Sequence, residues 1–124
     1  MNNVTVCVQV MAYYYAKKRN REVTKYWNQK VLKAFNAFDE EVFKPGKLDV
    51  KTKELCAVAA TYITRCPYCI EGHAKRAIAA GATKEELAEV IAVAAALGAG
   101  ASMAHMNFAL EAGDDEEKYL KDDE

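Results

Sequence analysis

Apolar residues recur at helical spacing along this chain, and that spacing constrains its fold more than any other feature. From residue 22 to residue 43 the large apolar side chains are separated by four, four, three and four positions, which places them on one face of a helix. We expect this aromatic-rich stripe to face the protein core. Its members are Trp27, Val31, Phe35, Phe38 and Val42.

Start and stop signals predict further helices after Pro45-Gly46. A helix over about residues 50–64 follows Asp49 as N-cap, and its apolar side holds Leu55, Val58, Ala59, Tyr62 and Ile63. Another begins at Pro67, a residue favoured at the first helical position, and runs to about Ala80 before Gly81.

The last third of the chain is also predicted to be helical. Thr83 and Glu86 have the spacing of a capping box, and the helix that they begin carries an apolar face from Leu87 to Leu97. We expect Gly98 and Gly100 to break or kink it, with another helix over about residues 101–112. The predicted fold is therefore an all-α, antiparallel helical bundle.

The two ends differ from this central part. Val4, Val6, Val8 and Val10 alternate with other residues, which suggests a short strand within an N-terminal extension of uncertain structure, residues 1–21. Residues 114–124 hold seven acidic groups and two lysines, as expected of a solvated acidic tail. The helical domain is predicted over residues 22–113.

Composition excludes several classes of function. The 124 residues carry 17 Lys+Arg and 18 Asp+Glu, a net charge of −1, which gives no bulk attraction to nucleic acid or to an anionic membrane. We expect no secretory signal and no membrane-spanning segment, and hence a soluble, cytoplasmic protein.

Four cysteines, at positions 7, 56, 66 and 69, are too few for a disulfide scaffold. Two of them form Cys66-Pro67-Tyr68-Cys69, a close pair that indicates redox or metal chemistry. With Cys66 as N-cap, Cys69 lies one turn on at roughly 5–6 Å, and the helix N-terminus favours thiolate. His73 follows one turn later as a candidate base, whereas Glu71 should face solvent.

Three other interpretations of the pair are less favoured. Zinc would need Cys56 or His105 as a fourth ligand beside Cys66, Cys69 and His73, and no second knuckle is present, so we expect no metal and no cofactor. A glutaredoxin-like domain would need a strand before the motif, where the pattern is helical. An inert buried pair fits poorly with a helix N-cap.

The other cysteines and the second histidine have weaker signals. Cys56 is expected to be a small core residue, because free cysteines are often buried. Cys7 is expected to be incidental, and His105 to be a packed or interface histidine.

The chain resembles the AhpD-like alkylhydroperoxidases of the carboxymuconolactone decarboxylase superfamily. The resemblance lies in Glu54, eleven further residues, Cys66-x-x-Cys69, three more residues and His73, and in the flanking segments 45–54 and 80–86. It extends over about residues 22–112. The best-known members have a histidine where this chain has Tyr68.

The resemblance implies a helical peroxidase that assembles as homo-trimers or homo-hexamers. Glu54 and His73 would form a proton relay to Cys69, whose thiolate would attack a hydroperoxide, and Cys66 would resolve the sulfenic acid as a disulfide that a dithiol donor reduces. The helix dipole alone would favour Cys66 as the nucleophile, so the choice of Cys69 comes from the family.

Two alternative functions remain open at this point. One is a non-enzymatic thiol redox sensor or binding subunit in which the pair of cysteines opens and closes. The other is lactone chemistry of the decarboxylase type, in a branch of the superfamily that lacks the cysteine pair.

Overall fold

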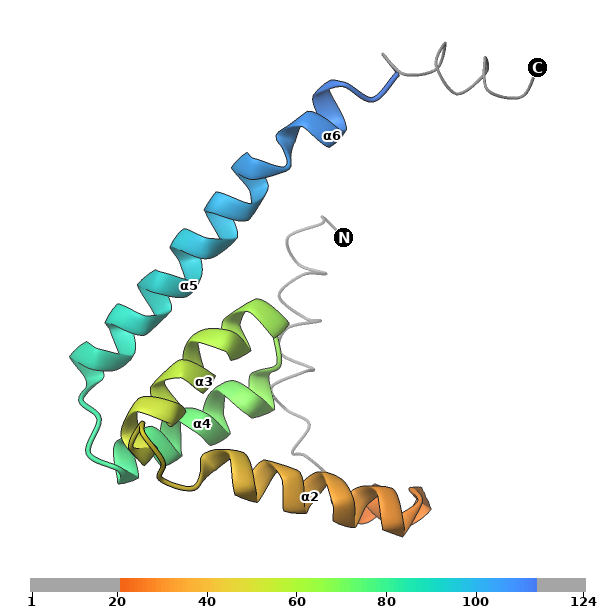
Figure 1. Ribbon diagram of the computed structural model, residues 1–124, viewed down its shortest axis with the longest axis vertical. Helices are drawn as coiled ribbons and strands as arrows, with labels where there is room; N and C mark the ends of the chain where they lie inside the picture. Colours follow the sequence, from red (N-terminus) through yellow and green to blue (C-terminus); the bar gives the residue numbers. More distant parts are fainter. Residues whose placement is uncertain (1–20, 114–124) are drawn as a thin grey trace, which may run out of the picture. The chain divides into compact units, whose positions relative to one another are not determined.

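The computed structural model of the chain describes residues 21–113 (Figure 1). This range is helical and contains no strand, which confirms the all-α prediction. The chain divides into two units between Val42 and Phe43. The expected N-terminal strand, the acidic tail and Cys7 lie outside the described residues.

The described part of the first unit consists of a 3₁₀ helix, η1 (Arg21–Tyr26), and most of α2 (Gln29–Phe43). A single helix over residues 22–43 was the wrong expectation. The reason is Asn28, whose side-chain Oδ1 accepts hydrogen bonds from the backbone N–H groups of Lys30 at 3.0 Å and Val31 at 3.4 Å. Such a bond satisfies amides that have no partner within a helix, and so α2 starts here.

The aromatic stripe of α2 is exposed, which corrects the expectation that it faces a core. The side chain of Trp27, just before α2, remains exposed to solvent, as do those of Val31, Phe35, Phe38 and Val42 within the helix. No residue of α2 is buried. The spacing indicates correctly that one face of the helix is apolar, but within residues 21–113 that face is exposed.

In the second unit, α3 (Val50–Thr64) begins as predicted at Asp49. The Asp49 carboxylate accepts a hydrogen bond of 2.7 Å from the backbone N–H of Thr52. This bond to the ionised form lowers the pKa of Asp49 from its ordinary value. Among its apolar residues Val58 is fully buried, whereas Tyr62 and Ile63 are exposed.

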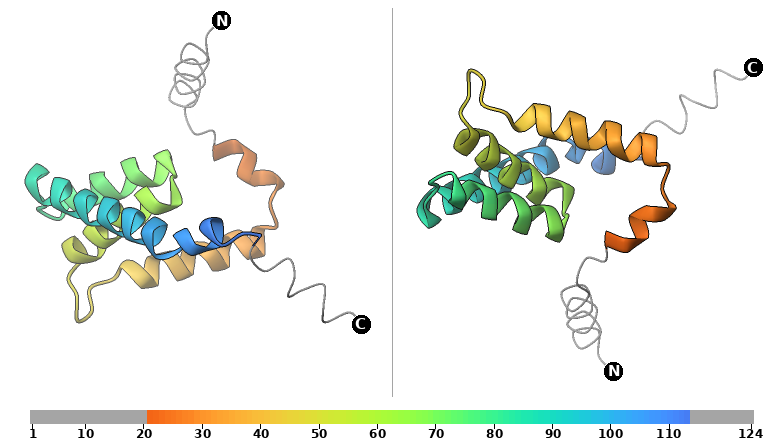
Figure 2. Two further views of the ribbon diagram at one scale, coloured as in Figure 1. Left: turned by 90° about the horizontal axis from the view of Figure 1, so that it is seen from above. Right: turned by 90° about the horizontal axis from the view of Figure 1, so that it is seen from below.

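Helices α3 and α4 (Pro67–Ala79) form an antiparallel pair, and α5 lies along α3 (Figures 1 and 2). Arg65 makes the turn between α3 and α4 in the left-handed region, with φ of 57°. Alanine residues dominate the buried positions of the pair and its surroundings, because small side chains allow the helices to approach closely. The buried apolar residues are Val58, Ala77, Ala82 and Ala94.

The capping box at the start of α5 (Lys84–Ala104) is confirmed, with Thr83 and Glu86 bonded to each other's backbone N–H groups. Glu86 also accepts a 2.8 Å bond from Lys51 on α3. The Lys51 ammonium, and then the Thr83 N–H, lower the pKa of Glu86 from its ordinary value. The same contact with Glu86 raises the pKa of Lys51. This ion pair ties α5 to α3.

The expected break at Gly98 and Gly100 was wrong, because α5 continues through both glycines to Ala104. A glycine in a helix costs only about 1 kcal/mol relative to alanine, and the neighbouring alanines favour the helix. The break comes instead at His105, where a short α6 (Met106–Leu110) begins. Every residue from 95 to 113 is exposed.

The segment Lys84–Leu110 is long enough and apolar enough to cross a membrane, judged by length and composition alone. This corrects the expectation that the chain has no segment of that kind. The support for a membrane segment is weak, because the core helix of a soluble protein satisfies the same criteria.

Loss of the α5 cap should destabilise the fold. We expect Thr83→Ala to lower the free energy of unfolding by about 1 kcal/mol, because the backbone N–H of Glu86 loses its partner. Urea denaturation followed by circular dichroism, at one protein concentration, measures this change. The control is Ser102→Ala, which removes another hydroxyl of α5, one that is bonded to the Gly98 carbonyl inside the helix. It should change stability by less than about 0.5 kcal/mol; equal losses in the two variants would contradict the role of the cap.

Candidate active site

The turn between α3 and α4 sets the position of the cysteine pair. After Arg65, Cys66 adopts an extended conformation and is the N-cap of α4, followed by Pro67 in the first turn. The backbone N–H of Cys69 donates to the Cys66 sulfur at 3.3 Å. The Cys66 side chain therefore satisfies one of the amides left without a partner at the start of α4.

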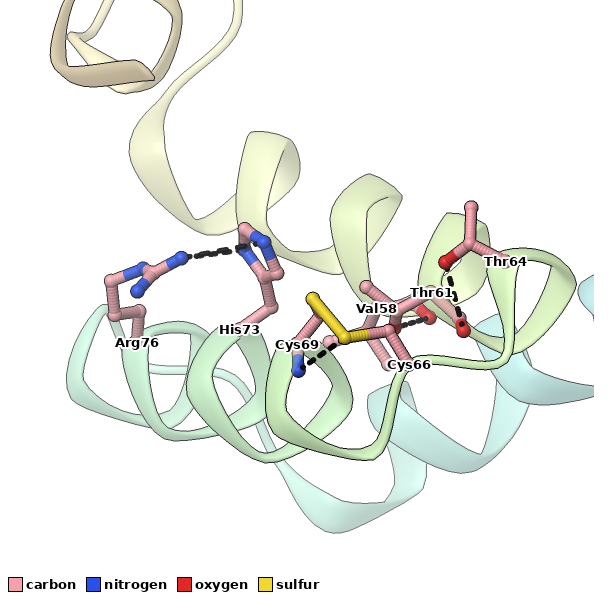
Figure 3. The surroundings of a disulfide bond; sticks show 7 residues. All are labelled: Val58, Thr61, Thr64, Cys66, Cys69, His73 and Arg76. Atoms are coloured by element: carbon pink, nitrogen blue, oxygen red, sulfur yellow. Dashed lines mark hydrogen bonds between the residues drawn. A yellow bond between two sulfur atoms is a disulfide. The ribbon is translucent and has the colours of Figure 1, made fainter. Parts of the chain in front are cut away.

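Cys66 and Cys69 form a disulfide with a Cα–Cα distance of 5.2 Å (Figure 3). This separation agrees with the one-turn spacing expected from the sequence. The Cys69 sulfur lies on the side of the disulfide that faces His73 (Figure 3). Because His73 follows Cys69 by four positions on α4, the two side chains share one face of that helix.

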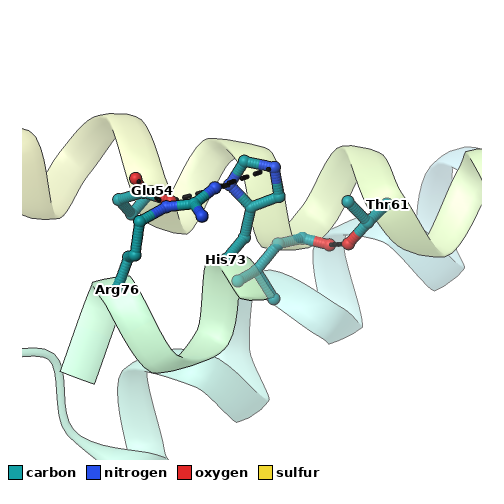
Figure 4. A network of polar contacts seen from close by, with 5 residues as sticks. Glu54, Thr61, His73 and Arg76 are labelled. Atoms are coloured by element: carbon teal, nitrogen blue, oxygen red, sulfur yellow. Dashed lines mark hydrogen bonds and ion pairs between the residues drawn. The ribbon is translucent and has the colours of Figure 1, made fainter. Parts of the chain in front are cut away.

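Glu54 is the most deeply buried charged group at this site. It comes from the N-terminal half of α3, and only 1% of its side chain is exposed. Both of its carboxylate oxygens are occupied by α4: Oε2 lies 2.7 Å from Nδ1 of His73, and Oε1 accepts a 2.8 Å bond from Nε of Arg76 (Figure 4). The structure thus brings Glu54 and His73 together, although they lie 19 positions apart in the sequence.

The His73 ring is held from two further directions. The aromatic ring of Phe43, at the end of α2, lies with its centroid 5.1 Å from that of His73. Nη2 of Arg76 lies 2.8 Å from Nδ1 and 3.4 Å from Nε2 of the imidazole. Since 16% of the His73 side chain is exposed, the ring sits at the edge of the protein surface.

Sequence reasoning missed Arg76 and Phe43. Arg76 is three positions after His73 and therefore one turn along the same helix, which is a signal that spacing could have given. Phe43 gave no comparable signal, because its approach to His73 depends on the path of the loop between α2 and α3. The guanidinium carbon of Arg76 lies 5.8 Å from the centre of the Phe43 ring, so the two residues also contact each other.

Other candidate residues lie elsewhere. Cys56 is an exposed free thiol, so its expected place in the core was wrong: on α3 it projects away from the buried side that holds Glu54 and Val58. Glu71 faces solvent as predicted and pairs with Lys75, whose ammonium lowers the pKa of Glu71 from its ordinary value. His105 is exposed, with its ring 5.5 Å from that of Phe108.

No cluster of three or more candidate metal ligands occurs in residues 21–113. The groups that converge are instead a dithiol pair, an imidazole, a carboxylate and a guanidinium. Such a set can transfer protons to and from a thiol, and the thiol pair can exchange two electrons by opening and closing its disulfide.

Comparison with known proteins identifies relatives of this chain. Residues 29–112 match the carboxymuconolactone decarboxylase family. A curated relative from Paracoccus denitrificans, called uncharacterized protein 4 in cox locus, is 53% identical over 77 residues, which are 62% of this chain and 69% of the relative.

Solved structures also include similar proteins, one of which is a member of the same family. A protein from Methanobacterium thermoautotrophicum has a TM-score of 0.61 and 40% identity, over 64% of this chain and 89% of its own. A carboxymuconolactone decarboxylase family protein from Thermotoga maritima, with a suggested involvement in antioxidative response, has a TM-score of 0.54 and 33% identity. That match covers 77% of this chain and 98% of the Thermotoga chain.

The capping role of Cys66 can be separated from its thiol chemistry. Under reducing conditions we expect Cys66→Ser to be more stable to urea than Cys66→Ala by about 1 kcal/mol, because a serine hydroxyl still accepts the Cys69 N–H. The matched pair at Cys56, an exposed position inside α3, should show the opposite order, because alanine is the better helix former there. If alanine were at least as stable as serine at position 66, the capping role would be ruled out.

Proposed function

Because this chain belongs to the carboxymuconolactone decarboxylase family, we propose that it is a thiol-dependent peroxidase that reduces hydroperoxides through Cys66 and Cys69. The observation that carries the proposal is the cysteine pair at the start of α4, one turn from a histidine that is bonded to a buried carboxylate. The suggested antioxidative involvement of the Thermotoga maritima protein supports the same chemistry.

In the reduced protein, Cys69 is the proposed nucleophile, because its sulfur lies on the His73 side of the pair. The Cys69 thiol gives its proton to His73, whose other nitrogen is bonded to Glu54. The thiolate attacks the terminal oxygen of the hydroperoxide. An S–O bond forms, the O–O bond breaks, and the alcohol leaves with the proton that His73 returns, so that Cys69 becomes a sulfenic acid.

The cycle then closes through Cys66. Its thiol attacks the sulfenic sulfur and water leaves, which gives the disulfide between the two cysteines. A dithiol, or a disulfide reductase that supplies one, returns two electrons by thiol–disulfide exchange. The net reaction converts one hydroperoxide and one dithiol into an alcohol, water and a disulfide, and it requires no metal or organic cofactor.

We propose a cytoplasmic location, because a dithiol cycle needs a compartment that reduces the disulfide after each turnover. The proposed reducing partner is a dithiol. The proposed substrates are hydroperoxides as a class.

The peroxidase proposal predicts consumption of cumene hydroperoxide or t-butyl hydroperoxide by the purified protein in the presence of a dithiol. We expect Cys69→Ser to lose this activity completely, because it removes the thiolate that attacks oxygen. Cys56→Ser is the matched control, since that thiol is exposed and belongs to a different helix from the pair, and it should keep wild-type turnover.

Several outcomes would contradict the proposal. Undiminished turnover in Cys69→Ser would exclude the assigned nucleophile. Slow, sub-stoichiometric reaction with peroxide, together with a partner that binds one redox state only, would favour a redox sensor. Activity on a lactone that survives removal of both cysteines would favour the decarboxylase type of chemistry.

We also propose that copies of this chain assemble into homo-trimers or homo-hexamers. The support is the exposed aromatic stripe of α2 and the exposed apolar residues at the end of α5 and in α6, which include Leu97, Met103, Phe108 and Leu110. So much exposed apolar surface is unusual for a soluble monomer, and it is typical of a surface that another protein covers.

Light scattering during size-exclusion chromatography tests the assembly. We expect the wild type to elute as an oligomer, and Phe38→Glu to shift it towards the monomer because a charge would be buried at the contact. Asn36→Glu adds the same charge on the opposite side of α2 and should keep the wild-type mass. A monomeric wild type would refute the proposal, and a wild type that remains dispersed only in detergent would point to a membrane instead.

A further inference from the structure

The carboxylate of Glu54 has two partners that are able to carry positive charge. Arg76 donates to it from Nε at 2.8 Å, and His73 approaches it through Nδ1 at 2.7 Å. Arg76 is charged at every physiological pH, whereas histidine changes its charge near neutrality. Between these two partners of Glu54, only the histidine is of a residue type whose charge changes in the physiological pH range.

The contacts of Glu54 favour one of the two ring nitrogens of His73 as the position of the proton. A guanidinium stabilises the ionised form of a carboxylate that is bonded to it, and an ionised carboxylate only accepts hydrogen bonds. The short contact between Glu54 and His73 must then be donated by His73, through an N–H on Nδ1. Nη2 of Arg76 lies 2.8 Å from the same nitrogen and 3.4 Å from Nε2, so the guanidinium places a positive charge beside the ring.

Glu54 and Arg76 act on His73 in opposite directions. A buried carboxylate without another cation would hold the imidazole in its charged form, because burial of an uncompensated charge is costly. Arg76 already compensates that charge, and its guanidinium opposes a second cation next to it. The uncharged ring of Phe43, at the end of α2, also contacts the imidazole, and Cys69 lies on the same face of α4 as His73.

We propose that Arg76 is a positioning residue that, by neutralising the buried carboxylate of Glu54, keeps His73 uncharged and protonated on Nδ1, with Nε2 as the base for the thiol of Cys69. This inference rests on the proposed function in one respect only, which is that Nε2 of His73 accepts the proton of the Cys69 thiol. An imidazole that already carries both protons cannot accept a third from the thiol. Arg76 thus determines whether the Glu54–His73 pair can act on Cys69 at neutral pH.

Nitrogen NMR of the protein labelled with ¹⁵N-histidine, in its disulfide form and without peroxide, tests the charge directly. The chain has two histidines, so His105→Gln assigns the signals. We expect the wild type at pH 7 to show a neutral His73 with its proton on Nδ1. If the wild type shows an imidazolium, or a proton on Nε2 in place of Nδ1, the proposal is overturned, and no Arg76 variant is needed for that conclusion.

Variants at Arg76 test the cause. Arg76→Gln removes the charge but keeps a hydrogen-bond donor, and we expect the midpoint of the His73 titration to rise by about one pH unit or more. Arg76→Lys keeps the charge and should restore at least half of this shift. Lys75→Gln is the matched control: it removes one positive charge from the adjacent position, where the side chain is 72% exposed, and it should leave the midpoint unchanged.

A midpoint in Arg76→Gln that stays constant or falls would overturn the proposal, as would an equal rise in Lys75→Gln. The rate of reaction of the reduced protein with peroxide provides the second readout. Its pH profile should move to higher pH in Arg76→Gln by the same amount as the His73 titration, whereas a purely structural loss would lower the rate without moving the profile. Because the NMR titration uses the disulfide form, it remains decisive even if the protein reduces no peroxide.

Discussion

The burial of Glu54 between α3 and α4 is the constraint on which the arrangement of the site depends. A carboxylate with almost no exposure is tolerated only where cations and hydrogen-bond donors meet it, and both of its oxygens are met by side chains of α4. The hydrogen bonds that satisfy this charge also fix how α4 lies on α3. Since His73 and Cys69 are on the same face of α4, the position of the base relative to the sulfur follows from that packing.

The apolar interior of a single chain contributes little by comparison. In residues 21–113 the buried apolar side chains are one valine and three alanines, which together remove only a small apolar area from water. The helical arrangement therefore depends strongly on polar contacts. These are the ion pair between Lys51 and Glu86, the helix caps and the hydrogen bonds of Glu54. Meanwhile most of the large apolar side chains, including Trp27 and Phe38, point to solvent. The chain therefore has the composition of a globular protein, but its described part buries only a minor share of its apolar residues.

Local signals predicted the parts of the fold that are determined locally. Asp49, Cys66 and Thr83 begin helices as expected, because a cap is a contact between residues three positions apart. Prediction failed where the outcome depends on distant surfaces: the stripe around Phe35 and the thiol of Cys56 were assigned to a core that does not cover them. For the site, Cys66, Cys69 and His73 were found by spacing and resemblance. Arg76 was missed, because its importance arises from contact with Glu54, 22 positions away.

As the cap of α4, Cys66 is held close to Cys69, which favours it over thiols from solution as the partner of Cys69. Pro67 fixes one backbone angle of the first turn, and the Cys69 amide holds the Cys66 sulfur beside it. In the reduced protein the second thiol is consequently present at a high effective concentration, with little chain entropy left to lose when the ring closes. A thiol from solution reacts with Cys69 only in competition with this neighbour. If the pair exchanges with thiols as proposed, a mixed disulfide at Cys69 is expected to convert quickly to the internal disulfide.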